Sequence, residues 1–240
     1  MPSTGGWCSL GRMNAAAQEL SIRIDDSTTV SGLFIAPPQP IACLVLGHGA
    51  GAGMNHPSMS AVATELGALR IATLRYQFPY MERGSKRTDP PPVCHATVRA
   101  AVRTASELEP SVPLFAGGRS FGGRMTSQAQ AIEPLPQVRG LIFLAFPLHP
   151  AGKPSDERAQ HLDNVKIPML FVQGTRDELA TLELLHPVIN RLGSRATLQL
   201  LPDADHAFHV PARTGQKDAD VRARALQSVA AWCQSLSPGV

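Results

Sequence analysis

The sequence of 240 residues is poor in the features that mark several special classes of protein. Aromatic residues make up 5% of it and charged residues 17%, and it contains no run of about 18 apolar residues that could span a membrane. Only four cysteines are present, and no two of them form a C-x-x-C pair. We therefore expect a protein of a reduced, cytoplasmic compartment, without disulfides and without a membrane span.

The chain also lacks charge blocks and a secretory signal. Its 22 basic and 19 acidic residues are scattered, with no basic stripe of the kind that binds nucleic acid, so we expect no nucleic-acid partner. Residues 1–12 have neither the charged start nor the apolar core of a signal peptide. We expect residues 1–18 to form a flexible tail and residues 19–238 to form one domain. The oligomeric state is left open.

The order of apolar segments predicts an α/β fold. Residues 19–25 and 28–36 alternate between apolar and polar side chains, which indicates an antiparallel N-terminal hairpin. Beyond it, strand-like and helix-like segments alternate, which predicts a mainly parallel, doubly wound sheet with helices on both faces. The expected strands are 41–46, 71–75, 113–116, 140–146, 168–173 and 197–201, and the expected helices are 59–69, 93–108, 121–132, 179–192 and 217–235.

Two connections bear on how open a site at the sheet edge would be. Residues 76–92 make a long loop, and loops of this length in compact domains are usually functional or disordered. Residues 147–166 have room for one short helix, so we predict no cap domain and an open site for small or extended substrates. The side chains that either form the rim of that site or pack the long loop onto the body are Tyr76, Phe78, Tyr80 and Met81.

The most informative motif is the segment Gly-Arg-Ser-Phe-Gly at residues 118–122. It follows an apolar strand and precedes a helical pattern, which is the setting in which a G-x-S-x-G motif carries a nucleophile. The turn is so tight that the residues two before and two after the serine have no room for side chains. Ser120 is thus the candidate nucleophile.

A serine hydroxyl needs a base within hydrogen-bond reach and an acid that orients the base. Asp177 follows one predicted strand and His206 follows the next, so both lie with Ser120 at the carboxyl edge of the sheet. The order Ser, Asp, His is the one expected on such a fold. Other assignments remain open, because Asp177 could cap a helix and the nearest rivals are Glu178 for the acid and His209 for the base.

The glycine-rich loop of residues 47–53 supports two interpretations. Backbone amides of Phe121 and of Ala50, or alternatively Gly51, would stabilise the negative charge on a tetrahedral intermediate. The same loop satisfies a G-x-G-x-x-A pattern, which would make the protein a nicotinamide dinucleotide-dependent oxidoreductase. Asn55, His56 and Pro57 delay the following helix and weigh against that second interpretation. His48 is interpreted as a loop-packing residue, and no metal site or cofactor is predicted.

Four segments give the chain a family resemblance: Leu-Gly-His-Gly-Ala-Gly-Ala-Gly-Met-Asn-His-Pro, Phe-Pro-Tyr-Met-Glu-Arg-Gly, Gly-Gly-Arg-Ser-Phe-Gly-Gly-Arg-Met and Ala-Asp-His-Ala-Phe-His-Val-Pro. From about residue 19 onward it resembles the α/β-hydrolase superfamily. It is most similar there to a dienelactone-hydrolase-like subfamily whose relatives include a testis-expressed hydrolase-like protein and the hydrolase-like domain of a subunit of the non-specific lethal chromatin complex. Dienelactone hydrolase uses cysteine where this chain has Ser120, so the resemblance does not imply dienelactone as the substrate.

The combined expectation is a serine hydrolase that cleaves a carboxylester or thioester of a small acyl substrate through Ser120, His206 and Asp177. A catalytically silent interaction protein is the main alternative, because the resemblance to a chromatin-complex subunit implies that the fold can serve that purpose. The sequence does not choose the acyl group.

Overall fold

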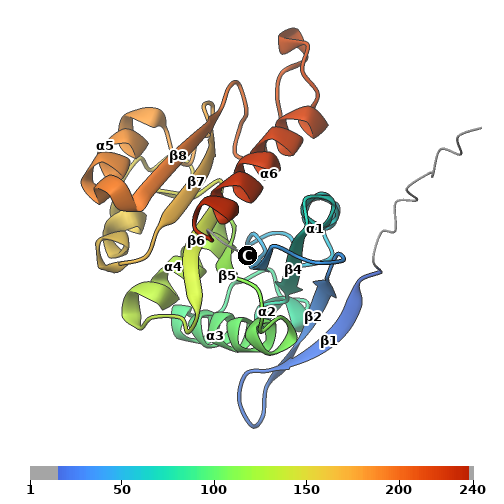
Figure 1. Ribbon diagram of the computed structural model, residues 1–240. Coiled ribbons are helices and arrows are strands. Elements are labelled where there is room, and N and C mark those ends of the chain that lie inside the picture. The colour runs from blue at the N-terminus through green and yellow to red at the C-terminus, as the bar shows by residue number, and fades with distance from the viewer. Residues whose placement is uncertain (1–15, 238–240) are drawn as a thin grey trace, which may run out of the picture.

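The computed structural model describes residues 16–237, and within them an eight-stranded sheet forms the centre of the molecule (Figure 1). The strands are β1 Gln18–Arg23, β2 Thr29–Ile35, β3 Ala42–Gly47, β4 Ile71–Tyr76, β5 Leu114–Arg119, β6 Val138–Leu144, β7 Met169–Gly174 and β8 Ala196–Leu201. Their spatial order is β1-β2-β4-β3-β5-β6-β7-β8. β2 pairs antiparallel with β1 and with β4, and all other neighbours pair parallel.

Helices cover both faces of this sheet. They are α1 Pro57–Ala68, α2 Pro79–Glu82, α3 Pro91–Leu108, α4 Phe121–Ile132, α5 Leu182–Leu192 and α6 Asp218–Ser235, with 3-10 helices η1 Glu157–Asn164, η2 Gly193–Arg195 and η3 Ala212–Thr214. α1 and α6 contact each other on one face, and α3 and α4 contact each other on the opposite face (Figure 1). The buried side chains form two clusters accordingly, and α5 contributes to the cluster of α3 and α4.

This architecture confirms the predicted α/β fold with its N-terminal antiparallel hairpin. β1 begins at Gln18, and the flexible tail expected at residues 1–18 lies largely outside the described residues, which begin at 16. The helix expected from residue 179 begins at Leu182, because the chain before it turns around Asp177, whose carboxylate accepts the Leu179 amide at 2.8 Å. Residues 147–166 hold the single 3-10 helix η1, as the prediction of one short helix in that segment required.

The turn between β5 and α4 depends on close backbone contact with the end of β3. Ser120 occupies the strained conformation φ 48°, ψ −111°. A Cβ on Gly122 would lie 2.4 Å from both the carbonyl carbon and the oxygen of Gly47, and one on Gly118 would lie 2.4 Å from that same oxygen. These distances are shorter than any side chain allows, which is why both positions flanking Ser120 are glycine.

Of the two alternatives for the four side chains of the residue 76–92 loop, packing onto the body holds for three of them and the substrate rim does not. Tyr76, Phe78 and Tyr80 are completely buried, and Met81 is half-buried against the same core. The three rings join a cluster of edge-to-face contacts in which Phe78 lies 5.3 Å from Phe121. The apolar area gained by burying large aromatic rings explains why they turn inward rather than toward a substrate.

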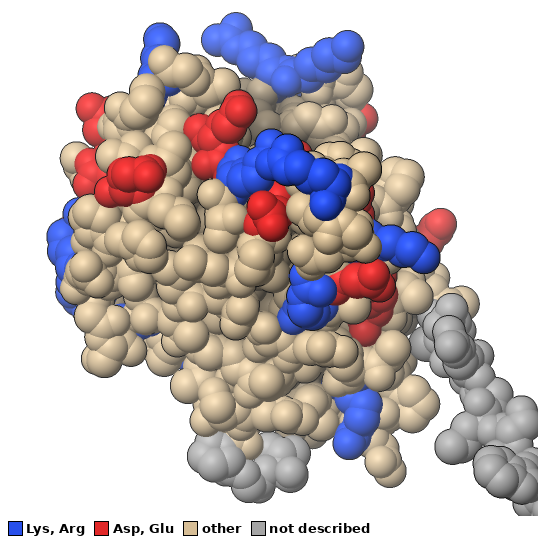
Figure 2. All heavy atoms as spheres, turned by 90° about the horizontal axis from the view of Figure 1, so that it is seen from above, with Lys and Arg blue, Asp and Glu red and all other residues tan. Residues whose placement is uncertain are grey.

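Most charged side chains lie on the surface, and the described cysteines lie in the interior. On the face of α1 and α6, basic and acidic side chains are interspersed (Figure 2). Cys43, Cys94 and Cys233 are buried free thiols, and Cys8 lies outside the described residues. Between residues 16 and 237 every helix is too short or too polar to cross a bilayer.

The contact between α4 and η1 contains a buried histidine. His161 of η1 donates from Nε2 to the Ser127 hydroxyl of α4 at 2.8 Å, and that hydroxyl donates in turn to the Arg124 carbonyl at 2.9 Å. Burial, followed by the nearby positive charge of Arg124, lowers the pKa of His161 from 6.5 to about 4. The imidazole is therefore neutral near pH 7.

Replacing Gly122 by alanine is expected to destabilise the protein by about 3 kcal/mol, because the added methyl group would overlap the Gly47 backbone. Gly67→Ala is the matched control. It lies inside α1, where an added Cβ meets only Ile35 at 3.8 Å, and should stabilise by about 0.5–1 kcal/mol. Chemical denaturation measures both values. Equal stability of G122A and wild type would contradict the packing described for this turn.

The free energy of unfolding should fall as pH is lowered from about 6.5 to about 4. The pKa of His161 is depressed in the folded state, so the unfolded chain binds a proton that the folded protein excludes. The contribution is at most about 1.4 kcal/mol per pH unit. His161→Gln should flatten the dependence, while His186→Gln, at an exposed position of α5, should leave it unchanged. An unaltered slope in H161Q would refute the assignment.

Candidate active site

Ser120 lies at the carboxyl edge of the sheet, where the strand order reverses between β4-β3 and β5-β6. Such switch points leave a crevice above the sheet, and ligands bind there in open α/β folds. Its amide donates to the Leu144 carbonyl of β6 at 3.0 Å, which anchors the strained residue. The hydroxyl is thus held above the junction of β3, β5 and β6. Ser120 is partly exposed to solvent.

His206 approaches this hydroxyl from the loop after β8. Its Nε2 is 2.9 Å from Ser120 Oγ, and its Nδ1 is 2.7 Å from Asp177 Oδ2. Since a carboxylate can only accept, Nδ1 carries the proton and the lone pair of Nε2 faces the serine hydroxyl. The imidazole side chain is 27% exposed and that of Asp177 is fully buried, so the histidine can meet a ligand and the acid cannot.

Asp177 comes from the loop after β7 and uses both carboxylate oxygens. Oδ1 accepts the Leu179 amide, while Oδ2 accepts from His206 and from Gln173. The capping role and the orienting role, set out above as alternatives for Asp177, therefore coexist. The rivals are placed elsewhere: Glu178 is exposed, and His209 pairs with Asp218 at 2.7 Å.

Two supporting residues were not identified from the sequence. Buried Gln173, at the end of β7, donates to Asp177 at 2.5 Å and accepts the Phe146 amide at 2.9 Å. Arg119 donates to the His206 carbonyl at 3.1 Å, and its guanidinium lies 5.6 Å from the centre of the Phe208 ring. A glutamine ending an apolar strand was the available signal for Gln173. The contact of Arg119 with the His206 carbonyl could not be predicted, because it depends on the path of the loop after β8.

Asp205 shapes the histidine loop itself. Its carboxylate accepts the amides of Ala207 at 2.7 Å and His209 at 2.9 Å, and its own amide donates to the His209 carbonyl at 3.0 Å. Aspartate side chains commonly form such turns, because they readily bind nearby backbone amides. It holds His206 at the tip of a rigid turn.

Free backbone amides lie near Ser120. Phe121 begins α4, so its amide has no partner within the helix, and no acceptor binds it among residues 16–237. In the loop after β3, the Ala50 carbonyl accepts the Tyr80 hydroxyl at 2.9 Å. Because a peptide is planar, the Gly51 N–H must point away from Tyr80. The Ala50 amide belongs to a peptide whose Gly49 carbonyl accepts His48 Nδ1 at 2.8 Å.

His48 holds this loop from below, as expected of a loop-packing residue. It is fully buried, and its Nε2 accepts the Phe78 amide at 3.2 Å. Burial lowers its pKa below the ordinary value, which keeps the ring neutral. The ring contacts Phe78 and Tyr80 edge-on, with centroids 5.0 and 6.0 Å away. The aromatic side chains therefore support the glycine loop rather than lining a substrate rim.

The dinucleotide interpretation finds no support in this geometry. α1 begins at Pro57, which has no amide proton to offer a pyrophosphate, and His56 occupies the cap before it. Arg75, the residue that might have met a cofactor phosphate, is buried and donates to the Met54 carbonyl and to Ser60 Oγ, both at 2.9 Å. Within the described part of the chain, no group of three His, Cys, Asp or Glu side chains could hold a metal ion.

Comparison with known proteins places this geometry in a family. Residues 40–234 match the family described as Alpha/beta hydrolase domain. Among solved structures, a dienelactone hydrolase from Anabaena variabilis superposes with a TM-score of 0.69 at 20% identity, over 91% of this chain and 96% of that one. A serine hydrolase without lid from Xanthomonas campestris gives 0.70 at 23% identity, over 90% and 95%.

A third structure, an alpha-beta serine hydrolase homologue from Coxiella burnetii, gives a TM-score of 0.69 at 19% identity over 89% of this chain and 98% of that one. At these identities the structural matches establish the fold alone. The family match covers most of the chain and includes Ser120, Asp177 and His206. The chain belongs to the alpha/beta hydrolase family.

Proposed function

We propose that the protein is a serine hydrolase that cleaves an ester-type bond through an acyl-enzyme. The observation that carries the proposal is the continuous hydrogen-bond chain from Ser120 through His206 to Asp177, with links of 2.9 and 2.7 Å. A scaffold protein would have no need of a strained serine directed at a histidine that is in turn oriented by a buried acid.

In the first half of the reaction, His206 Nε2 takes the hydroxyl proton as Ser120 Oγ attacks the carbonyl carbon. The tetrahedral intermediate collapses when the same proton passes to the departing alcohol or thiol. Asp177 stabilises the imidazolium formed between these steps and keeps the proton on Nδ1 at other times. Water then attacks the acyl-enzyme, with His206 again as base, and releases the carboxylic acid and free Ser120.

The negative charge of each intermediate needs preorganised donors. The unpaired amide of Phe121 is one of them, and the second comes from the glycine loop, at Ala50 or Gly51. Tyr80 and His48 hold that loop through their hydrogen bonds to Ala50 and Gly49. Their burial makes the donors rigid, so little reorganisation is needed when charge develops.

The substrate class follows from the absence of a cap in the described chain. The connection from β6 to β7 holds only η1, which leaves the edge above Ser120 open to small or extended acyl compounds. The solved neighbours are consistent with this, since one is named a serine hydrolase without lid and another an esterase domain from Rhodothermus marinus. Carboxylesters and thioesters are both compatible with the site.

Ser120→Ala should lower kcat/KM toward short 4-nitrophenyl esters or thioesters by about 10⁴-fold or more, and Asp177→Asn by about 10⁴-fold. Ser228→Ala, on α6 at the opposite face of the sheet, is the control and should retain wild-type rates. Initial rates over a panel of acyl lengths measure all three. A folded wild-type protein as inert as S120A toward the whole panel would favour the interaction-protein alternative.

A further inference from the structure

Two arginines differ from the other shielded arginines of the protein. Arg75 donates to two oxygens and Arg222 binds the Glu65 carboxylate through Nε and Nη2. Arg124 and Arg158 are half-buried, yet among residues 16–237 neither guanidinium donates a hydrogen bond or forms an ion pair. The Nε of Arg124 is fully buried without an acceptor. Shielding a cation from water without a hydrogen-bond partner costs free energy. The two arginines are therefore candidates for binding a group from outside the protein.

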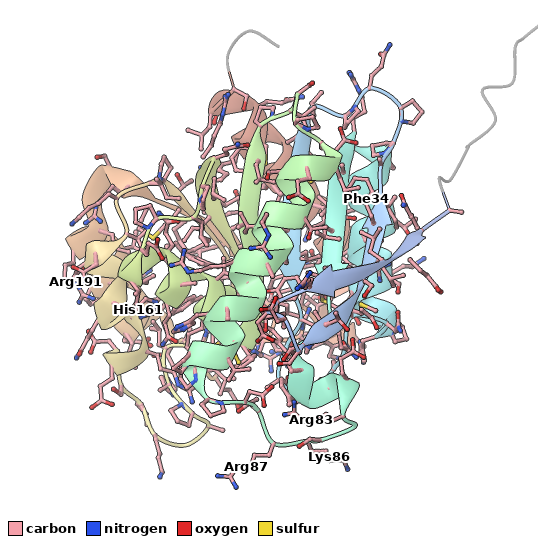
Figure 3. All side chains as sticks on the ribbon, turned by 90° about the horizontal axis from the view of Figure 1, so that it is seen from below. Phe34, Arg83, Lys86, Arg87, His161 and Arg191 are labelled. Carbon is pink, nitrogen blue, oxygen red and sulfur yellow. The ribbon has the colours of Figure 1, made fainter. Side chains whose placement is uncertain are left out.

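The two guanidiniums belong to neighbouring helices whose contact is fixed. The hydrogen bond between Ser127 and His161 joins α4 to η1, the 3-10 helix whose position Figure 3 indicates by the label on His161. Arg124 stands three residues before Ser127, and Arg158 three residues before His161, so each arginine shares a face with its joined residue. The arginines therefore lie at the same contact.

Between residues 16 and 237 no carboxylate forms an ion pair with Arg124 or Arg158. The nearby positive charge of Arg158 adds to burial in lowering the pKa of Arg124, which shows that the two charges lie within mutual influence. Glu157, the adjacent carboxylate, is exposed and forms no ion pair with either arginine. His161 is neutral near pH 7, so the local charge is that of two cations.

The pair is close to the candidate nucleophile. Arg124 lies one helical turn after Ser120, and its amide donates to the Ser120 carbonyl at 3.1 Å. Its guanidinium lies 5.7 Å from the centre of the Phe121 ring, whose own amide is a candidate oxyanion donor. A group bound by Arg124 would therefore lie beside the first turn of α4, the helix that directly follows Ser120.

Arg158 also faces open space. It lines a hollow of about 400 Å³ in the connection after β6, together with Lys153, His149 and one carboxylate, that of Glu157. His149 is buried, and its Nε2 has no hydrogen-bond partner in the described structure. Its Nδ1 donates to the Pro150 carbonyl at 2.9 Å, so Nε2 can accept a hydrogen bond. The hollow thus holds the two cations Arg158 and Lys153, one carboxylate and an unused polar atom, and Arg124 stands at the α4 side of the same helix contact.

We propose that Arg124 and Arg158 form a subsite for an oxyanion, and that the ester cleaved at Ser120 carries a carboxylate or phosphate group in the part of the molecule that extends toward η1. The second half of this inference rests on the proposed hydrolase function. Two guanidiniums suit such a group because each presents parallel N–H donors in the geometry of an oxyanion.

The kinetic test compares mono-4-nitrophenyl glutarate, which ends in a carboxylate, with its neutral methyl ester. Wild type should prefer the anionic ester, and Arg124→Gln or Arg158→Gln should lower the ratio of the two kcat/KM values at least about tenfold, the effect of losing one charge-assisted contact. Arg224→Gln removes the same charge from α6 on the opposite face and should keep the wild-type ratio.

A binding test does not depend on turnover. Monomethyl glutarate and inorganic phosphate are titrated separately by calorimetry into full-length S120A protein, and the better ligand identifies the kind of oxyanion. Saturable binding should weaken at least about tenfold when R124Q or R158Q is added, and should survive R224Q. Because the arginines repel each other, R158Q should not lower the melting temperature, whereas a structural arginine would.

The outcomes separate the two proposals. Equal rates on both esters, with no anion binding, would overturn the subsite and leave the hydrolase function standing. Anion binding that depends on both arginines, without hydrolysis of either ester, would support the subsite and count against the hydrolase. Loss of melting temperature in R158Q together with no anion binding would assign the arginines a structural role and overturn the subsite.

Discussion

The close approach of three glycines is the constraint on which the rest of the site depends. Gly47 ends β3, while Gly118 and Gly122 flank Ser120, and hypothetical Cβ atoms on the last two would overlap the Gly47 backbone. Without side chains, the end of β3 and the start of α4 touch directly. This single contact brings the loop after β3, the strained serine and the free amide of Phe121 to one place at the edge of the sheet.

The remaining parts of the site reach that place along parallel strands. β7 and β8 end at the same edge as β5, so Asp177 and His206 need only short loops to meet Ser120. Hydrogen bonds from Gln173 and Arg119 then hold the acid and the histidine loop. The placement of the candidate catalytic side chains thus depends first on the direction of the strands and then on local hydrogen bonds.

A charge arrangement completes this picture on the side of α4 and η1. The three residues Ser120, Phe121 and Arg124 occupy the first turn of α4 and the residue before it, so the candidate nucleophile, an oxyanion donor and an unpaired cation share one rigid element. In contrast, Lys86 and Arg87 extend from the loop after α2 away from the body (Figure 3). The proposed subsite differs from these loop cations because Arg124 is fixed on a helix.

Much of the fold could be predicted from the sequence because apolar runs of strand length report burial on both faces, and their alternation with helices limits the topology. The proximity of Ser120, Asp177 and His206 follows from the same logic, since each comes directly after a strand. The directions of side chains within loops cannot be predicted in this way. Nothing in the pattern of residues 77–92 says which way Phe78 turns, because loops have no period.

The contacts that support the candidate catalytic residues could not be predicted from the sequence for a related reason. Arg124 and Arg158 are 34 positions apart in the chain, and an unpaired charge becomes visible only when every neighbour in space is known. Gln173 and Arg119 acquire their roles from loops that follow other strands. Sequence patterns thus locate the candidate catalytic groups, while the groups that orient them are found only in the three-dimensional structure.

The central claim is that Ser120 is a nucleophile activated by His206. The most direct measurement is the intact mass of folded protein after incubation with a fluorophosphonate, followed by peptide mapping. We expect one phosphonyl adduct per chain, located on Ser120 and absent from a His206→Ala variant. An unmodified wild-type protein, or an adduct on another residue while Ser120 stays free, would contradict it.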